Sequence, residues 1–209
     1  MAKILVFGDS VAWGAFDFEK GGWVDRLKVS YLNEIDKESG EPKYYVYNLG
    51  ISSDDTKGTL FRLKTQIEIV EEIEPDDYIF VFYLGENDAR YIKEPENKVV
   101  SLEDYEKNLN EIIKIARGYS DKIFFIGMGE IDETKTKPYL VETQDYYENK
   151  DIKEYNNKLK EICEDEKVDF IDMQGILEKS DLYDGLHPNE KGHEKIHKRI
   201  KEHLDNNLK

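Results

Sequence analysis

Five short apolar runs divide the chain at intervals. Each is four to six residues long, a length that suits a buried strand better than a helix. The runs cover residues 4–7, 44–49, 78–83, 122–126 and 168–171. The third run is the most apolar stretch of the chain, so we expect it to form a central strand that is covered on both faces.

Between these runs, apolar side chains recur every three or four residues, which is the spacing of one helix face. The pattern predicts helices over residues 23–40, 56–70, 101–118, 151–162 and 188–204. Ser101 and Asp104 resemble a capping box at the start of the third helix. Pro188 suits the first turn of the last helix. A turn is expected at residues 75–77, where proline and aspartate interrupt the pattern.

Strand and helix alternate five times along the chain. This order predicts an α/β fold, with a five-stranded parallel sheet and helices on both faces joined by right-handed crossovers. We find no repeat, low-complexity tract or linker, so a single domain over residues 1–209 is expected. Residues 127–149 are long, polar and aperiodic, which is typical of a functional loop and makes them a candidate substrate-facing segment.

Polar residues follow four of the predicted strands. The four motifs are Gly8-Asp9-Ser10, Asn48-Leu49-Gly50, Gly85-Glu86-Asn87-Asp88 and Asp184-Gly185-Leu186-His187-Pro188. Parallel strands end at one edge of their sheet, which is where open α/β folds bind ligands. The motifs can therefore converge although they lie far apart in the sequence.

The residue types in these motifs match acyl-transfer chemistry. Ser10 can attack a carbonyl, His187 can take and return its proton, and Asp184 can orient the imidazole. The N–H groups of Ser10 and Gly50, together with the Asn87 amide, can bind the oxyanion that develops. The sequence thus predicts a Ser-His-Asp triad with an oxyanion hole, and no cofactor or metal is expected.

These four motifs, in this order and over nearly the whole chain, resemble those of the SGNH hydrolases, also called the GDSL esterase/lipase family. The resemblance places the nucleophile at Ser10, the Asp-x-x-His pair at Asp184 and His187, and the oxyanion donors at Ser10, Gly50 and Asn87. It also implies a three-layer α/β/α sandwich of flavodoxin-like type. Ser52-Ser53 stands where many members have Ser-Gly, which leaves the shape of the pocket wall open.

Charge and composition argue against two classes of binding partner and indicate a cellular compartment. The net charge of -16 argues against binding to nucleic acid or to an anionic membrane. No run approaches the length of a membrane span, and Met1-Ala2-Lys3 leads directly into the first strand, so no signal peptide is expected. The lone Cys163 fits a reducing cytoplasm and is expected to be a buried thiol. The composition does not indicate an oligomeric state.

Two other classes of function compete with this interpretation. His193-Glu194-Lys195-Ile196-His197 matches the H-E-x-x-H pattern of zinc peptidases, although the helix is amphipathic and both histidines are better explained by packing. A binding module that has lost catalysis is the other alternative, and the complete catalytic set argues against it. Asp9, Asn48 and Asp88 are expected to serve as turn and cap residues.

The sequence favours a small ester with a short acyl group. The 127–149 segment has few consecutive apolar residues and so offers little apolar area to a long acyl chain; its charged residues include Glu130, Asp132, Glu133, Lys135 and Lys137. A slot made by Trp13, Phe16 and Tyr139 would change this expectation, and Arg90 and Tyr91 are weaker candidates for substrate contact. Lysophospholipase, thioesterase and carbohydrate O-acetylesterase activities remain alternatives on the same site.

Overall fold

The computed structural model describes residues 2–70 and 77–208. Five strands form one parallel sheet in the order β2-β1-β3-β5-β7. Their bounds are β1 Ala2–Gly8, β2 Tyr44–Gly50, β3 Asp77–Tyr83, β5 Ile123–Ile126 and β7 Asp169–Ile171. Pro75 and Asp76, part of the expected turn, lie outside the described residues.

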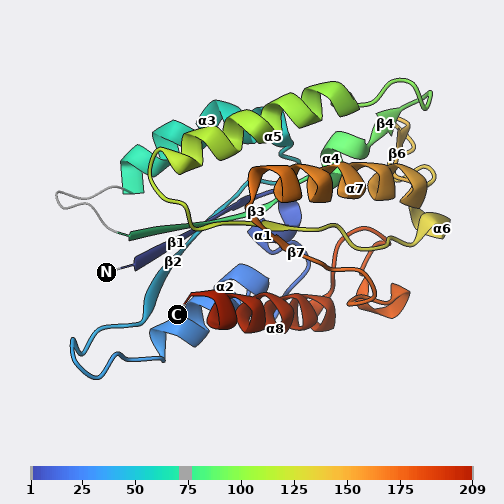
Figure 1. Cartoon of the computed structure of the whole chain (residues 1–209). Coiled ribbons are helices and arrows are strands. Elements are labelled where there is room, and N and C mark those ends of the chain that lie inside the picture. The colour runs from blue at the N-terminus through green and yellow to red at the C-terminus, as the bar shows by residue number, and fades with distance from the viewer. Residues whose placement is uncertain (1, 71–76, 209) are drawn as a thin grey trace.

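Helices cover both faces of this sheet, so the predicted three-layer α/β/α sandwich is confirmed (Figure 1). One face carries α2 (Trp23–Leu32) and α8 (Glu190–Asn207). The other carries α3 (Thr56–Val70), α5 (Leu102–Arg117) and α7 (Asn149–Glu166). This strand order is that of flavodoxin-like folds, which bind ligands where the winding direction reverses, beside β1 and β3.

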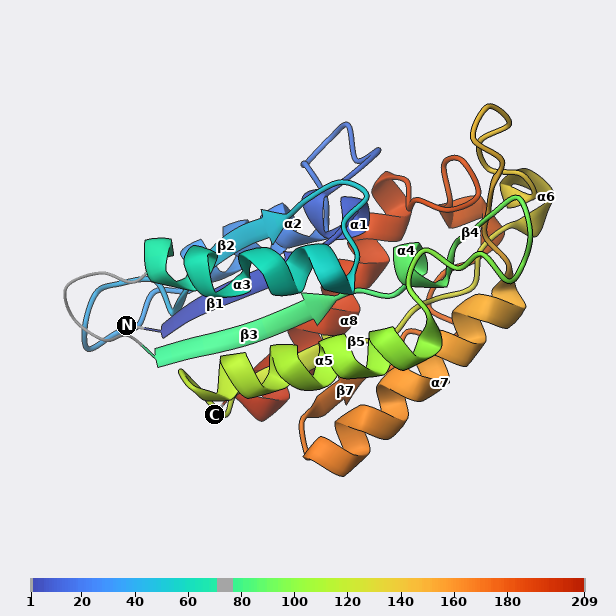
Figure 2. The same ribbon diagram turned by 90° about the horizontal axis from the view of Figure 1, so that it is seen from above.

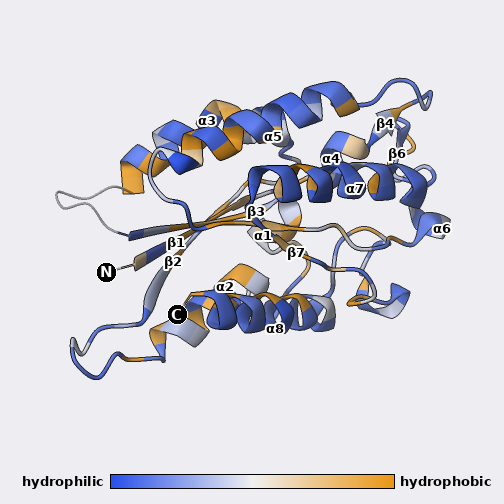
Figure 3. Ribbon diagram, viewed as in Figure 1, coloured by the Kyte–Doolittle hydropathy of each residue, from blue (hydrophilic) through white to orange (hydrophobic). Residues whose placement is uncertain are grey.

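The alternation of side chains along β1 explains the two cores. Leu5 and Phe7 pack with α3, α5 and α7, whereas Ile4 and Val6 pack with α2 and α8. All four side chains are fully buried. Figure 3 shows the apolar strands enclosed by helices whose polar residues face outward.

Short elements gather at the carboxyl edge of the sheet, toward which β3 points in Figure 2. They are α1 (Ser10–Trp13), α4 (Glu86–Ala89), β4 (Tyr91–Ile92), α6 (Glu133–Thr136), β6 (Asp145–Tyr146) and the 3-10 helix Lys179–Asp181. The sequence pattern predicted none of these elements, because each is too short to show a period. Within the described ranges, every helix is too short or too polar to cross a bilayer.

Several predicted helix boundaries differ from the structure, and α7 and α8 each extend beyond the predicted end, to Glu166 and Asn207. The first helix ends at Leu32 instead of continuing to residue 40, because residues 34–43 turn back on themselves and Ile35 bridges Pro42. The last helix begins at Glu190, where the Asn189 side chain accepts the N–H groups of residues 191 and 192, so Pro188 precedes the cap. The α7 helix begins two residues before the predicted start.

Candidate active site

The nucleophile candidate lies directly after the first strand. β1 ends at Gly8, where an added Cβ would lie 2.7 Å from the carbonyl oxygen of Tyr83 on β3, so this close approach requires glycine. Asp9 then caps α1, because its side chain accepts the Val11 N–H at 2.8 Å. This confirms the cap role expected for Asp9 and places Ser10 at the start of α1.

Ser10, His187 and Asp184 form a continuous hydrogen-bonded chain. Ser10 Oγ lies 2.8 Å from His187 Nε2, and His187 Nδ1 lies 2.8 Å from Asp184 Oδ2. The Asp184 carboxylate can act only as a hydrogen-bond acceptor, so His187 Nδ1 must carry the proton. His187 Nε2 is then free to accept the proton of Ser10. Ser10 is 7% exposed and His187 is 8% exposed, so both side chains are largely shielded from solvent.

Four donors hold the Asp184 carboxylate. The main-chain N–H groups of Leu186 and His187 bind Oδ1 at 3.0 and 2.8 Å, as expected of a turn. His187 Nδ1 and the Tyr139 hydroxyl, at 2.7 Å, bind Oδ2. Burial alone would raise the pKa of Asp184, but these hydrogen bonds outweigh it and hold the pKa well below its usual range. Asp184 is therefore ionised at neutral pH.

Gly50 lies against the first turn of α1. A Cβ at this position would lie 2.4 Å from the Trp13 nitrogen, so only glycine lets the end of β2 approach α1 this closely. The Gly50 N–H donates to Asn48 Oδ1 at 3.0 Å, which confirms the turn role expected for Asn48. To bind an oxyanion, the Gly50 N–H would have to donate to the oxyanion and Asn48 Oδ1 together, or release Asn48 Oδ1.

Asn87 is buried at the start of α4. Its Nδ2 donates to the carbonyl oxygen of Asp54 at 3.0 Å and to Asp9 Oδ2 at 3.3 Å. Its Oδ1 accepts the hydroxyl of Tyr147 at 2.9 Å. The contact with Asp9 is the longer of the two that Nδ2 makes, so it is the one that an oxyanion would most readily replace.

Two further carboxyl groups lie beneath the site. Burial, together with the neighbouring Glu86 carboxyl, raises the pKa of Asp9 well above its usual value. Burial also raises the pKa of Glu86, whose Oε1 accepts the Tyr83 hydroxyl at 2.8 Å. A positive charge on His187 works against this effect by stabilising the Glu86 carboxylate, but burial is the larger of the two, so the pKa of Glu86 is raised overall. A protonated base at His187 would thus have a second carboxyl group nearby besides Asp184.

The three side chains considered for an apolar slot do not form a single wall. Trp13 is 58% exposed and points away from the core. The ring of Phe16 stacks on that of Tyr183 with centroids 4.4 Å apart and lies 5.2 Å from the His187 ring. The Tyr139 hydroxyl is engaged by Asp184. Phe16 and Tyr139 therefore flank the imidazole, and Phe16, but not Tyr139, also lines a hollow with Trp13.

An open hollow of about 460 Å³ adjoins α1. Aromatic residues, glycines and two aspartates line it: Trp13, Gly14, Ala15, Phe16, Asp17, Phe18, Gly21 and Asp25. The Asp17 carboxylate is itself buried and paired with Arg26 at 2.8 Å. Phe16 is common to this hollow and to the surroundings of His187. The hollow is thus adjacent to the triad.

The loop from residue 127 to residue 149 lies at the same edge of the sheet and contributes Tyr139 and Tyr147 to the site. Arg90 forms an ion pair with Asp145 of this loop at 3.6 Å. Tyr91 is buried, and its hydroxyl donates to Glu148 at 2.6 Å. Arg90 and Tyr91 thus support the loop.

The H-E-x-x-H segment uses its histidines for packing. His193 is fully buried, its Nδ1 accepts the Trp23 N–H at 3.2 Å, and its Nε2 donates to the Ala15 carbonyl at 2.9 Å. His197 Nε2 lies 3.0 Å from the Ser30 hydroxyl. Among the residues that the structure describes, no three histidine, cysteine or acidic side chains are grouped to hold a metal ion.

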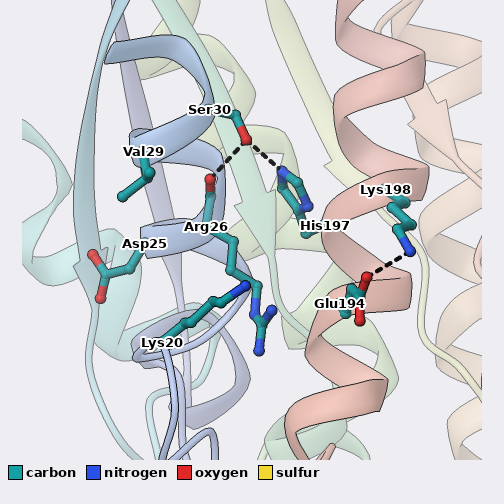
Figure 4. A pocket seen from close by; sticks show the side chains of 8 residues that line it. All are labelled: Lys20, Asp25, Arg26, Val29, Ser30, Glu194, His197 and Lys198. Carbon is teal, nitrogen blue, oxygen red and sulfur yellow. Dashed lines mark hydrogen bonds and ion pairs between the residues drawn. The ribbon is translucent and has the colours of Figure 1, made fainter. Parts of the chain in front are cut away.

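A separate hollow of about 480 Å³ lies between α2 and α8 (Figure 4). Its lining consists of Lys20, Asp25, Arg26, Val29, Ser30, Glu194, His197 and Lys198. Several of these groups bind one another: Lys198 pairs with Glu194 at 2.6 Å, and Ser30 donates to the Arg26 carbonyl at 3.0 Å. None of the triad residues lines it.

Sequence reasoning missed three contributors to the site. Tyr147 belongs to no motif, Glu86 lies in the third motif but was given no role, and Tyr139 was considered only as a wall of the acyl slot. Their roles depend on partners 45 to 60 residues away or on burial. The one signal that pointed to the tyrosines was the length of the 127–149 segment.

Comparisons with known proteins bear on the family and the fold of the chain. A model of the GDSL-like Lipase/Acylhydrolase family matches residues 6–195. No curated protein matches the sequence. The fold is similar to that of a lipase/acylhydrolase from Enterococcus faecalis, with a TM-score of 0.74, 21% identity and coverage of 99% of this chain and 97% of the other.

Two further solved structures are similar over 97% of this chain. A member of the lipolytic protein G-D-S-L family from Veillonella parvula has a TM-score of 0.71 and 18% identity, and 97% of it is covered. An acetylxylan esterase from Geobacillus stearothermophilus has a TM-score of 0.70 and 20% identity, and 93% of it is covered. At these identities the structural likeness establishes the fold, whereas the family match extends over most of the sequence. The chain therefore belongs to the GDSL-like lipase/acylhydrolase family and is an ester hydrolase.

Proposed function

We propose that the protein is a serine esterase in which Ser10 is the nucleophile, His187 the general base and Asp184 the group that orients the base. The observation that carries this proposal is the chain of two 2.8 Å hydrogen bonds from Ser10 through His187 to Asp184. Within this proposal neither a metal nor a cofactor takes part in the reaction.

In the first half-reaction, Ser10 Oγ attacks the ester carbonyl carbon while its proton passes to His187 Nε2. The carbonyl π electrons move to oxygen and form a tetrahedral oxyanion. As the oxyanion collapses, the bond to the alcohol oxygen breaks and His187 Nε2 gives its proton to the leaving alcohol. Water then repeats the sequence on the acyl-enzyme, releasing the carboxylic acid and restoring Ser10.

The oxyanion is stabilised by the main-chain N–H groups of Ser10 and Gly50 and by the Asn87 amide. Among the described residues, the Ser10 N–H donates to no protein acceptor, which suits a group kept available for substrate. Gly50 and Asn87 already donate to Asn48, Asp54 and Asp9. These bonds hold both donors in place before the charge develops.

The substrate we propose is an ester of a short acyl group. Charged side chains interrupt the apolar positions of the 127–149 segment from Glu130 to Lys137, although Leu140 and Val141 are exposed at its tip. This segment therefore offers little continuous apolar area to a long acyl chain. A small soluble substrate and the cytoplasmic location expected from the free, buried Cys163 are part of the same proposal.

Carbohydrate O-acetylesterase activity is the second candidate. The hollow beside α1 combines the rings of Trp13, Phe16 and Phe18 with the Asp25 carboxyl group, a combination that suits a hydroxylated ring. One of the structurally similar proteins is an acetylxylan esterase. An acetylated sugar would meet the short-acyl requirement and place its ring in this hollow.

An organophosphonate ester tests the proposal directly. It should add covalently to Ser10 and stop turnover, and peptide mass spectrometry should place the adduct there. Ser10→Ala should neither be labelled nor hydrolyse p-nitrophenyl acetate, although its melting temperature should stay close to that of the wild type. An adduct on another residue, together with an active Ser10→Ala variant, would overturn the proposal.

A further inference from the structure

Two tyrosines of one loop reach the two halves of the site. We call residues 137–148 the 137–148 loop; it joins α6 to α7. The Tyr139 hydroxyl donates to Asp184 Oδ2 at 2.7 Å, and the Tyr147 hydroxyl donates to Asn87 Oδ1 at 2.9 Å. The two rings meet edge to face, with centroids 5.5 Å apart at 88°.

We propose that Tyr139 and Tyr147 are positioning residues, Tyr139 for Asp184 and Tyr147 for Asn87, so that one loop sets both the base and the oxyanion side of the site. The inference rests on the proposed function, because it takes its catalytic roles from the triad and the oxyanion hole.

Tyr147 and Asp54 bind opposite ends of the Asn87 amide. The carbonyl oxygen of Asp54 can only accept and therefore selects the nitrogen, while the Tyr147 hydroxyl donates to the oxygen. A rotated amide would bring its oxygen against the Asp54 carbonyl and lose the Tyr147 donor. The pair thus fixes the direction of Nδ2, the atom that would meet the oxyanion.

Tyr139 completes the environment of Asp184 on the side of the imidazole. Its hydroxyl shares Oδ2 with His187 Nδ1 and lies 3.4 Å from that nitrogen. A second donor on the same oxygen limits rotation of the carboxylate about its bond to Cβ. This holds Oδ2 in the plane where His187 Nδ1 can donate to it.

Both hydroxyls stay protonated through the neutral range. Burial, followed by a hydrogen bond to Asp184, raises the pKa of Tyr139, and burial raises that of Tyr147. Each hydroxyl can therefore act as a donor at any pH where the esterase works.

The 137–148 loop is itself braced, which makes it a suitable carrier. Its arms are joined by the Tyr139 N–H donating to the Asp145 carbonyl at 2.7 Å and the Tyr147 N–H donating to the Thr136 carbonyl at 3.1 Å. Its β6 strand pairs with β4, where Tyr91 lies opposite Tyr146. The two tyrosines are thus held by main-chain bonds and do not depend on loop closure.

Steady-state kinetics with p-nitrophenyl acetate test the inference through a double-mutant cycle. Tyr147→Phe should lower kcat about tenfold and leave KM within about twofold, as expected for the loss of one hydrogen bond that matters mainly in the transition state. In an Asn87→Ala background the same change should alter kcat by less than about twofold, because its target is gone. Tyr139→Phe should lower kcat about threefold. In an Asp184→Ala background the same change should leave kcat unaltered, because the carboxylate that Tyr139 positions is absent.

Tyr146→Phe is the matched control. Tyr146 lies in the same loop, stacks on Tyr91 with centroids 5.0 Å apart, and makes no hydroxyl hydrogen bond to the described residues. Removing the Tyr146 hydroxyl should leave kcat and KM unchanged. Melting temperatures of all variants report folding, and the Tyr139 cycle gives an independent answer if Tyr147→Phe is poorly folded.

The outcomes separate the inference from the proposed function. If a tyrosine variant lost the same fraction of kcat with and without its target, Asn87 or Asp184, the tyrosine would have a general packing role and the inference would be overturned. Wild-type kcat in both tyrosine variants would also overturn it. If Ser10→Ala kept its activity, the proposed function would fall and the positioning roles with it. An inactive Ser10→Ala with additive tyrosine effects would overturn the positioning roles alone.

Discussion

The Asp88 carboxylate binds Thr56 across 32 residues of sequence. Asp88 Oδ1 accepts the main-chain N–H of Thr56 at 3.1 Å and its hydroxyl at 2.5 Å, and both residues are fully buried. This confirms the cap role expected for Asp88, because Thr56 is the first residue of α3. It also ties α4, which carries Asn87, to a helix outside the site.

This buried carboxyl predicts a pH dependence of stability. Burial raises the pKa of Asp88 to about 7, against a usual value of 3.8, while the bonds from Thr56 act in the opposite direction. The folded state therefore retains a proton that the unfolded chain loses, so this residue's contribution to the free energy of unfolding falls as pH rises from 4 to 7.

Asp88→Asn isolates that contribution. The variant should gain stability relative to the wild type as pH rises from about 4 to 7, and the difference should level off above the folded pKa. Urea unfolding of both proteins at several pH values measures it. His193, His197 and His203, whose burial lowers their pKa values, act in the opposite sense but equally in both proteins. Parallel curves would contradict the prediction.

Asn87→Ala should affect turnover more than substrate binding. Its amide meets a charge that is present only in the transition state, so kcat should fall about 10²–10³-fold while KM changes little. Asn108→Ala is the control: Asn108 donates to the Thr56 hydroxyl at 3.0 Å, within the same network but outside the proposed oxyanion hole. The control should lose stability and keep its kcat. A rise in KM alone for Asn87→Ala would exclude the oxyanion role.

Gly50→Ala should disturb the nucleophile through the backbone. The added methyl group would lie 2.4 Å from the Trp13 nitrogen and 2.8 Å from the Ala12 carbonyl carbon, so α1 must shift. Overpacking of this kind costs about 1–3 kcal/mol of stability. We expect kcat/KM to fall at least about tenfold, because small displacements of reacting groups are costly. Gly129→Ala, which meets no atom within 4 Å, should behave as the wild type.

Acyl length should discriminate between the candidate substrates. Along a series of p-nitrophenyl esters, kcat/KM should be highest for acetyl to butyryl groups and fall beyond them. A long apolar groove would instead add roughly 0.8 kcal/mol per buried methylene. A steady rise through decanoyl would contradict the short-acyl prediction and favour a lysophospholipase or long-chain thioesterase.

A strong chelator should leave the hydrolysis rate unchanged, because the ring nitrogens of His193 are already engaged by Trp23 and Ala15. His193→Ala should instead lower stability. Each buried polar group left without its partner costs about 1–3 kcal/mol, and this variant leaves two. Loss of activity on chelation, restored by zinc, would revive the zinc-hydrolase alternative.

The strands and the meeting of Ser10, His187 and Asp184 were predictable because their signals are local. Residues 4–7 and 168–171 are apolar enough to mark buried strands, and parallel strands must end at one edge. Ser10 follows the first of these strands, and Asp184 and His187 lie in the loop after the second. The topology of the sheet then brings them together without further information.

The misplaced boundaries and the missed tyrosines have a different origin. Ile35 continues the helical spacing of Trp23, Leu27 and Tyr31, yet Asp36 accepts the Ser39 N–H at 2.8 Å in a turn that ends the pattern. Tyr147 acquires its role from Asn87, 60 residues earlier in the chain. Periodicity carries no information about such partners.

The separation of 177 residues between Ser10 and His187 has a consequence for synthesis. A ribosome delivers the amino-terminal part of a domain first. The nascent chain therefore presents the Ser10 hydroxyl long before His187 has been translated. Under the proposed mechanism, incomplete chains should not hydrolyse esters, and the onset of hydrolysis during translation would report the moment when the last βα unit docks.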